Sequence, residues 1–162
     1  MQKITPFLWF NNEAEEAAKF YTSTFKNSRI GKIARYDDAA SKASGRPAGS
    51  VMTVAFKLNG QDFVALNGGP HFKFTEAISL VVNCDTQAEL DRYWKKLTSG
   101  GGKSVQCGWL KDKYGLSWQI VPTILGKLAA DKDRAKANRV MQVVMTSVKL
   151  DIKKLKQAVK GK

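Results

Sequence analysis

Apolar residues follow two different periods along the first 70 residues. Residues 4–10 form a short apolar and aromatic run, which is typical of a strand, whereas residues 14–25 repeat apolar side chains every three or four positions, as on one face of a helix. Asn12 and Glu15 resemble a capping pair at the start of this helix. The pattern predicts, in order, strand 4–10, helix 14–25, strand 30–36, a long mobile polar loop 37–50, strand 52–58, an Asn59-Gly60 hairpin turn and strand 63–66.

The same order of elements returns in the residues that follow. Thr86 and Glu89 have the spacing of a capping box and precede apolar residues at helical intervals. Residues 89–94 of this helix also match residues 16–21 of the first helix in type and spacing, which is a weak internal repeat. The second half is predicted to contain strand 77–84, a helix that ends at Gly100–Gly102, strand 103–110, a turn at 113–115 and strand 116–121.

The repeated order predicts an α+β fold with two βαβββ halves, residues 1–70 and 71–123, if one strand of the second half is short or irregular, followed by a helical C-terminal extension, 124–162. The extension is rich in Ala, Lys, Met and Val and is expected to form two helices that break near residues 149–151. A chain of 162 residues fits one domain. We therefore expect residues 1–162 to form a single domain with a ligand cleft between its halves.

The net charge of +13 is concentrated towards the C-terminal end. Residues 1–123 carry 16 basic and 11 acidic side chains, a net charge of +5, whereas residues 124–162 carry 11 basic and 3 acidic side chains, a net charge of +8. Such a segment can bind phosphate backbones or anionic lipid. However, apolar residues recur at helical spacing between the lysines of 150–159, which favours a solvated amphipathic helix. We expect neither a nucleic acid nor a membrane partner.

The sequence predicts a cytoplasmic protein. Its longest apolar runs, such as residues 78–82, are far too short to span a bilayer, and residues 1–6 lack the apolar core of a signal peptide. Cys84 and Cys107 are therefore expected to be reduced thiols. Cys107 has no histidine near it in sequence that could activate it, so a structural role is favoured over a nucleophilic one.

Four segments give the sequence a resemblance to a known family: residues 4–10, residues 12–21, Ala65-Leu-Asn-Gly-Gly-Pro70 and the segment Cys107–Gln119. Together they resemble the PhnB-like family, whose members are often labelled 3-demethylubiquinone-9 3-methyltransferase. That family belongs to the vicinal oxygen chelate superfamily, with glyoxalase I, extradiol dioxygenases and bleomycin-resistance proteins. The resemblance implies paired βαβββ modules that form a concave mixed sheet, a site in that concavity, and a homodimer.

The resemblance also indicates where a metal would be held. Its four strand positions fall on Thr5, on Ala65 or Asn67, on Ala77 with Glu76 beside it, and on Gln119. Of these residues only Glu76 and Gln119 carry good donor atoms, and a metal centre of this kind needs at least three. The only histidine, His71, falls in a turn outside these positions. We therefore expect no metal ion and no other cofactor.

An apolar pocket with a few polar anchors is still expected at these positions. Thr5, Phe7 and Trp9 share one face of the first predicted strand. If Thr5 and Gln119 point into the concavity, Ser117 does so as well, and the surface becomes typical of a small-molecule site. Phe7 and Trp9 would fill the core equally well. The predicted ligand-binding residues are Thr5, Phe7, Trp9, Asn67, Glu76, Ser117 and Gln119.

Two functions from different classes follow. The favoured one is a protein that binds a small apolar or aromatic molecule in its cleft without a full metal site. The alternative is a metal-dependent, glyoxalase-like enzyme that uses Glu76 and Gln119. Methyl transfer from a nucleotide-type donor would need a Gly-x-Gly turn directly after a strand. Residues 100–102 follow a helix instead and are better explained as a helix stop, so methyl transfer is not expected.

Overall fold

The computed structural model describes residues 2–161 and separates into two compact units, Met1–Lys73 and Phe74–Lys162. Each unit has its own four-stranded sheet and its own helices. The expectation of one domain over 1–162 stays a prediction. Within the described residues, no helix combines the length and the apolar character needed to cross a membrane.

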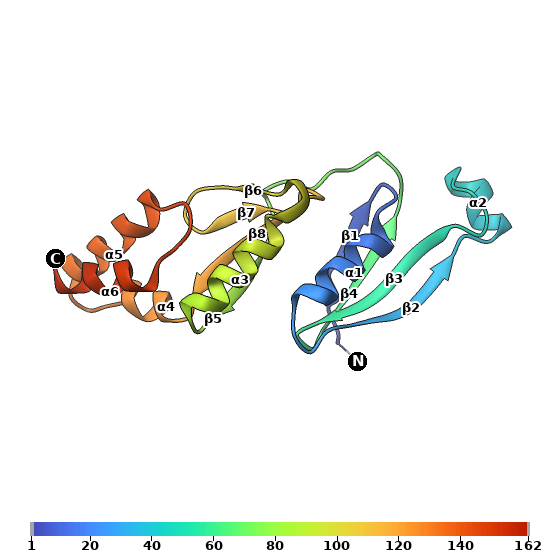
Figure 1. Cartoon of the computed structure of the whole chain (residues 1–162). Helices are drawn as coiled ribbons and strands as arrows, with labels where there is room; N and C mark the ends of the chain where they lie inside the picture. Colours follow the sequence, from blue (N-terminus) through green and yellow to red (C-terminus); the bar gives the residue numbers. More distant parts are fainter. Residues whose placement is uncertain (1, 162) are drawn as a thin grey trace. The chain divides into compact units, whose positions relative to one another are not determined.

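The first unit is a mixed sheet with a helix on one face (Figure 1). Its elements are β1 (Phe7–Phe10), α1 (Ala14–Thr24), β2 (Arg29–Arg35), α2 (Asp38–Ser44), β3 (Val51–Leu58) and β4 (Gln61–Asn67). The strand order is β1-β4-β3-β2, with β1 parallel to β4 and the other neighbours antiparallel. The predicted hairpin at Asn59-Gly60 joins β3 to β4, and both turn residues have positive φ, as a two-residue turn of this type requires.

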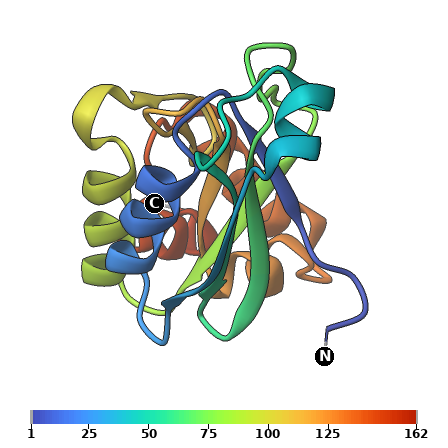
Figure 2. The same ribbon diagram turned by 90° about the vertical axis from the view of Figure 1, so that its right-hand side faces the viewer.

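The core of the first unit lies between α1 and the sheet. Leu8 and Phe10 alternate with Phe7 and Trp9 along β1, and only Leu8 and Phe10 are buried. The buried face of α1 is largely alanine, which allows the helix to pack closely on the strands, and it includes the fully buried Tyr21. Figure 2 shows α1 against the sheet, with α2 away from it in the β2–β3 connection.

The second unit repeats this topology. Its elements are β5 (Ser79–Cys84), α3 (Gln87–Leu97), the short 3₁₀ helix η1 (Ser99–Gly101), β6 (Lys103–Ser104), β7 (Trp109–Lys111) and β8 (Ser117–Pro122). The strand order β5-β8-β7-β6 is that of the first sheet, position for position, and β5 is parallel to β8. The predicted α+β fold with two βαβββ modules is confirmed.

Three helices follow β8 in the second unit: α4 (Ile124–Ala129), α5 (Arg134–Thr146) and α6 (Ile152–Lys160). Two helices were expected, and the break near residues 149–151 is confirmed. The chain between α5 and α6 lies against the β6–β7 connection, since the amide of Cys107 donates to Ser147 (2.7 Å) and that of Gly108 to Val148 (2.8 Å). Leu150 is fully buried at the end of this segment.

Three local predictions were wrong. The loop 37–50 contains α2, because Asp37 caps the amide of Ala40 (2.7 Å) and Gly45 ends the helix in the left-handed conformation. The strand 103–110 divides into β6 and β7, because Cys107 and Gly108 both have positive φ. Asn12 does not cap α1. The first amide of the helix, that of Ala14, instead donates a hydrogen bond to the side-chain oxygen of Asn67.

Candidate functional site

Most of the candidate site residues lie on or beside the open face of a sheet, meaning the face turned away from α1 in the first unit and from α3 in the second. In the first unit, alternation along β1 places Phe7 and Trp9 on the open face. Phe7 is 59% exposed and Trp9 is partly exposed, so neither belongs to the core beneath α1. Of the two readings of these aromatic residues, the structure supports a surface role.

Trp9 is held firmly on this face. Its indole N–H donates to the carbonyl of Gly69 (2.9 Å), and its ring meets that of Phe72 edge to face at 4.9 Å between centroids. Gly68 leaves room for the indole, because a Cβ there would lie 2.2 Å from the ring. Phe72 is itself 65% exposed and was missed by sequence reasoning, since it falls in a loop without periodicity. The pair presents a fixed aromatic surface to solvent.

Asn67 lies on the other face of the first sheet, towards α1. Its Oδ1 accepts from the amide of Ala14 (2.8 Å), its Nδ2 donates to the carbonyl of Val51 (3.1 Å), and the residue is only 5% exposed. Because the residue is buried, a ligand would reach this amide only by displacing the groups that cover it. Asn67 is therefore left out of the candidate site, and its observed contacts are structural.

The open face of the second unit carries a polar row. The amide Nε2 of Gln119 donates to the hydroxyl of Ser79 (2.9 Å), and the register sets Gln119 between Val81 on β5 and Trp109 on β7. Val81 is 51% exposed, and Trp109 is partly exposed. An oriented amide therefore lies between two apolar side chains that a ligand could contact.

Glu76 contributes to this face through an ion pair with Lys111. The hydrogen bond from Lys111 and, next, backbone hydrogen bonding hold the pKa of Glu76 below its usual range. Lys111 lies opposite Ser117 in the β7–β8 register, so the pair adjoins the row of polar residues. Because Glu76 is already bound to an ammonium group, it is a poor candidate for a metal ligand.

Ser117 occupies the centre of the row, between Ser79 and Lys111 in register. The residue is 1% exposed, and its hydroxyl has no hydrogen-bond partner anywhere in residues 2–161. An unsatisfied buried hydroxyl costs about 1–3 kcal/mol, so its presence calls for a physical explanation. A ligand that reached this covered hydroxyl with a polar group would supply the missing partner.

Sequence reasoning named Glu76, Ser117 and Gln119 but missed their neighbours Ser79 and Lys111. Ser79 and Lys111 fall on the same face as Ser117, but this becomes visible only once the strands are paired. Pairing of β8 with both β5 and β7 could not be read from periodicity alone. Thr5, the remaining predicted residue, is exposed just before β1.

Metal-binding groups are sparse on both open faces. Within residues 2–161 there is no cluster of three His, Cys, Asp or Glu side chains that could hold a metal ion. His71 is exposed, Ala65 is fully buried without a donor, and Gln119, whose Nε2 donates to Ser79, offers only its Oε1. The side chains present therefore do not fit a chelated metal centre.

The two cysteines are unpaired thiols in different environments. Cys84 is fully buried, and burial, aided by the negative charges of Glu89 and Asp85, raises the pKa of its thiol to about 12. Cys107 is partly exposed, and its sulfur lies 3.8 Å from that of Met145. We expect iodoacetamide at pH 8 to modify Cys107 while leaving Cys84 unmodified in the native protein, as measured by peptide mass spectrometry.

At pH 8, a thiol with a pKa near 12 is a thiolate in only about one molecule in ten thousand, and the thiolate is the species that reacts. Urea-unfolded protein is the control, because both cysteines should then react at similar rates. Equal labelling of Cys84 and Cys107 in the native protein would contradict the buried position of Cys84.

Comparison with known proteins gives a consistent result. The model of the 3-demethylubiquinone-9 3-methyltransferase family matches residues 2–121. The PhnB protein from Bacillus cereus is 40% identical in sequence. The match covers 75% of this chain and 100% of that protein, with a TM-score of 0.66. Protein PA1353 from Pseudomonas aeruginosa is 20% identical, with 75% and 98% coverage and a TM-score of 0.59.

A glyoxalase/bleomycin resistance protein/dioxygenase domain from Frankia sp. EAN1pec is 12% identical, with 75% and 92% coverage and a TM-score of 0.46. None of the curated proteins matches the chain. The family match ends at residue 121, and the whole Bacillus cereus protein corresponds to three quarters of this chain. The helices α4 to α6 therefore lie beyond the matched family region.

Proposed function

The chain belongs to the 3-demethylubiquinone-9 3-methyltransferase (PhnB-like) family, and on that premise we propose that it binds a small apolar or aromatic molecule on the open faces of its sheets. The family predicted from the sequence is thus confirmed, whereas the ligand and its binding are the proposal. The homodimer and the cytoplasmic location expected from the sequence stay predictions.

The hydroxyl of Ser117 is the observation that carries the proposal. It is buried and unpaired at the centre of a row that also contains the Gln119 amide and the Lys111–Glu76 ion pair. These groups offer both hydrogen-bond donors and acceptors to a carbonyl or hydroxyl of a ligand. Val81 and Trp109 flank the Gln119 amide, which is the combination of apolar walls and few polar groups that small-molecule sites use.

The topology of the two sheets supports small-molecule binding over methyl transfer. Each sheet is mixed and has strand order 1-4-3-2 within its module, whereas a dinucleotide-type fold needs a doubly wound parallel sheet. The glycines of 100–102 lie in and after η1, at the end of a helix, as expected from the sequence. A glyoxalase-like reaction has little support in the donors present, because Glu76 is paired with Lys111 and the described residues hold no cluster of three His, Cys, Asp or Glu side chains.

The proposal is tested by thermal unfolding of the purified chain against a panel of small aromatic compounds that includes demethylated ubiquinone analogues. A bound compound at 100 times its dissociation constant should add about 2.7 kcal/mol to the free energy of unfolding. If no aromatic compound raises the unfolding temperature, the proposal is wrong.

Replacement of Ser117 by alanine should separate binding from stability. Without ligand, the variant should be as stable as the parent or up to about 1 kcal/mol more stable, because an unsatisfied buried hydroxyl is removed. A compound that binds the parent should stabilise the variant less, by about 1 kcal/mol or more in the free energy of unfolding. Calorimetric unfolding with and without the compound measures both quantities.

The matched control is Ser99→Ala, which removes an exposed serine hydroxyl in η1, away from the polar row. It should leave the ligand-induced stabilisation unchanged. A Ser117→Ala variant that is stabilised by the ligand as strongly as the parent would show that the hydroxyl has no role in binding.

A further inference from the structure

The open face of the first unit contains a hollow of about 320 Å³ whose lining combines charged and apolar groups. It lies at the end of the sheet where β3 turns into β4, and all its residues belong to the first unit. The side chains that line it on the open face are those of Thr5, Arg29, Ala55, Lys57, Asp62 and Val64. None of its residues belongs to the polar row around Ser117, and its role goes beyond the proposed function.

Three of these side chains form a row across neighbouring strands. Arg29 on β2 is the register partner of Lys57 on β3, and Lys57 is the partner of Asp62 on β4. Directly opposed side chains of this kind lie about 5 Å apart at their Cβ atoms, and like charges in that position are destabilising. Arg29 and Lys57 are such a like-charged pair, so an anion placed beside them would be stabilised.

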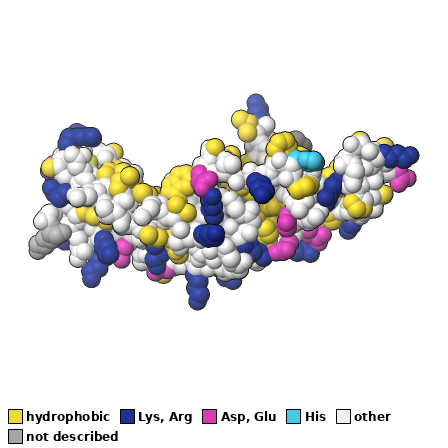
Figure 3. All heavy atoms as spheres, turned by 90° about the horizontal axis from the view of Figure 1, so that it is seen from above, with side chains coloured by type: hydrophobic (Ala, Val, Ile, Leu, Met, Phe, Trp, Pro, Cys, Tyr) yellow, Lys and Arg dark blue, Asp and Glu magenta, His cyan; other side chains and the backbone are white. Residues whose placement is uncertain are grey.

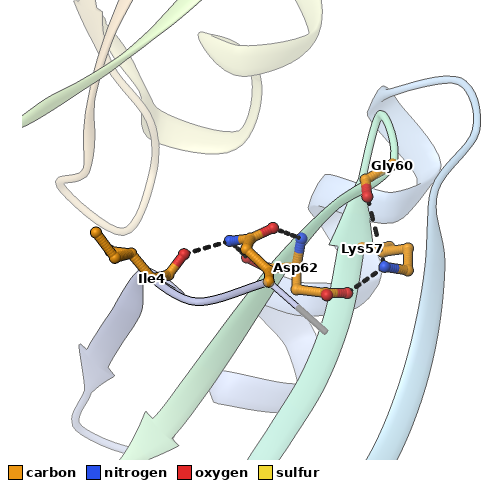
Figure 4. Close-up of polar contacts among 5 residues, drawn as sticks. Ile4, Lys57, Gly60 and Asp62 are labelled. Carbon is orange, nitrogen blue, oxygen red and sulfur yellow. Dashed lines mark hydrogen bonds and ion pairs between the residues drawn. The ribbon is translucent and has the colours of Figure 1, made fainter.

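Asp62 neutralises only one of the two cations. Lys57 forms an ion pair with Asp62 and donates a second hydrogen bond to the carbonyl of Gly60 (3.4 Å), as Figure 4 shows. The backbone of Asp62 is in turn held by Gln2, whose amide accepts from its N–H (3.0 Å) and donates to its carbonyl (3.2 Å). The carboxylate therefore lies on a fixed strand beside Lys57.

Arg29 has no such partner. Within residues 2–161 its guanidinium forms no hydrogen bond or ion pair, and the hydroxyl of Thr5 is likewise unpaired. A planar guanidinium is the side chain best suited to bind two oxygens of one carboxylate at once. Two cations and one carboxylate give the row a net charge of +1, which suits a monoanion better than a phosphate dianion.

Gly31 is one of the residues that line the hollow. A Cβ on Gly31 would lie 3.1 Å from the carbonyl oxygen of Ala55, closer than most such contacts, so a side chain there would crowd the strand. Ala55 and Val64 add an apolar surface next to the charged row. The hollow thus offers a cationic end and an apolar wall to the same small molecule.

We propose that this hollow binds a small organic monocarboxylate, with its carboxylate on the Arg29 guanidinium and its apolar body against Ala55 and Val64. Lys57 adds a second positive charge beside the bound carboxylate, and the hydroxyl of Thr5 adds a donor. The bound carboxylate neutralises the positive charge of Arg29. The site is a carboxylate subsite whose residues all belong to the first unit.

The test compares benzoate with benzamide, which has the same ring and no charge, by titration of the ¹⁵N-labelled chain followed by NMR. Benzoate should shift the backbone amides of 29–31, 55–57 and 62–64 in a saturable manner, and benzamide should bind at least about tenfold more weakly. Equal binding of the two compounds, or benzoate shifts confined to other residues, would overturn the proposal.

Arg29→Gln should reduce benzoate affinity at least about tenfold, because the charged bidentate contact is lost. Arg29 is exposed, so the variant should fold, which its own NMR spectrum verifies. Lys32→Gln is the matched control, since it removes one exposed positive charge from the same strand outside the hollow. An equal loss in Lys32→Gln would show diffuse charge attraction in place of a defined site, which would overturn the proposal.

Discussion

Replacing Gly102 with alanine is expected to lower the free energy of unfolding by about 2–4 kcal/mol. Gly102 follows η1 and precedes β6. A Cβ there would lie 2.7 Å from the carbonyl oxygen of Leu97 and 2.8 Å from that of Lys111. Both contacts are backbone atoms, so relief requires movement of the end of α3 or of β7 instead of a side-chain rotation. Chemical unfolding in urea measures the change.

Gly102 has φ −64°, so its effect is one of space and not of backbone conformation. Gly126 is the matched control, because it lies inside α4 and a Cβ there would meet nothing within 4 Å. Gly126→Ala should raise the free energy of unfolding by about 0.5–1 kcal/mol, the usual gain of alanine over glycine in a helix. Equal stability of the two variants would contradict the close packing of Gly102 against Lys111.

The fold was predictable where the determining residues are close in sequence. Thr86 accepts from the amide of Glu89 (3.2 Å), and Asn59-Gly60 forms its turn, because these motifs need only neighbouring residues. The cap of α1 was missed because the partner of Ala14 is Asn67, 53 positions away. No local pattern contains that contact.

In the candidate site too, features set by neighbouring residues were predicted and features set by distant residues were not. Alternation along β1 correctly separated Phe7 and Trp9 from the buried residues beside them. Asn67 was predicted to bind the ligand with them because it falls near the end of the fourth strand. In the structure, its side chain points from β4 towards α1. Strand alternation fixes which residues share a face, whereas strand pairing fixes which face that is, and pairing depends on contacts far apart in sequence.

Asn67→Ala is expected to lower the free energy of unfolding by about 2–4 kcal/mol. The substitution leaves the buried amide of Ala14 and the carbonyl of Val51 without their side-chain partner, and each loss costs about 1–3 kcal/mol. Hydrogen exchange of the α1 amides should also become faster, because the helix loses the group that holds its first turn on β4. Urea unfolding and hydrogen exchange by NMR measure the two effects.

Asn83→Ala provides the control, since Asn83 is an exposed asparagine on β5 of the second unit. Its replacement should change the free energy of unfolding by less than about 0.5 kcal/mol. The comparison separates two roles for Asn67. If its amide is structural, Asn67→Ala is destabilised and its folded fraction still binds the ligand that the parent binds. If its amide instead serves the ligand, the variant is as stable as Asn83→Ala and binding is lost, which would return Asn67 to the site.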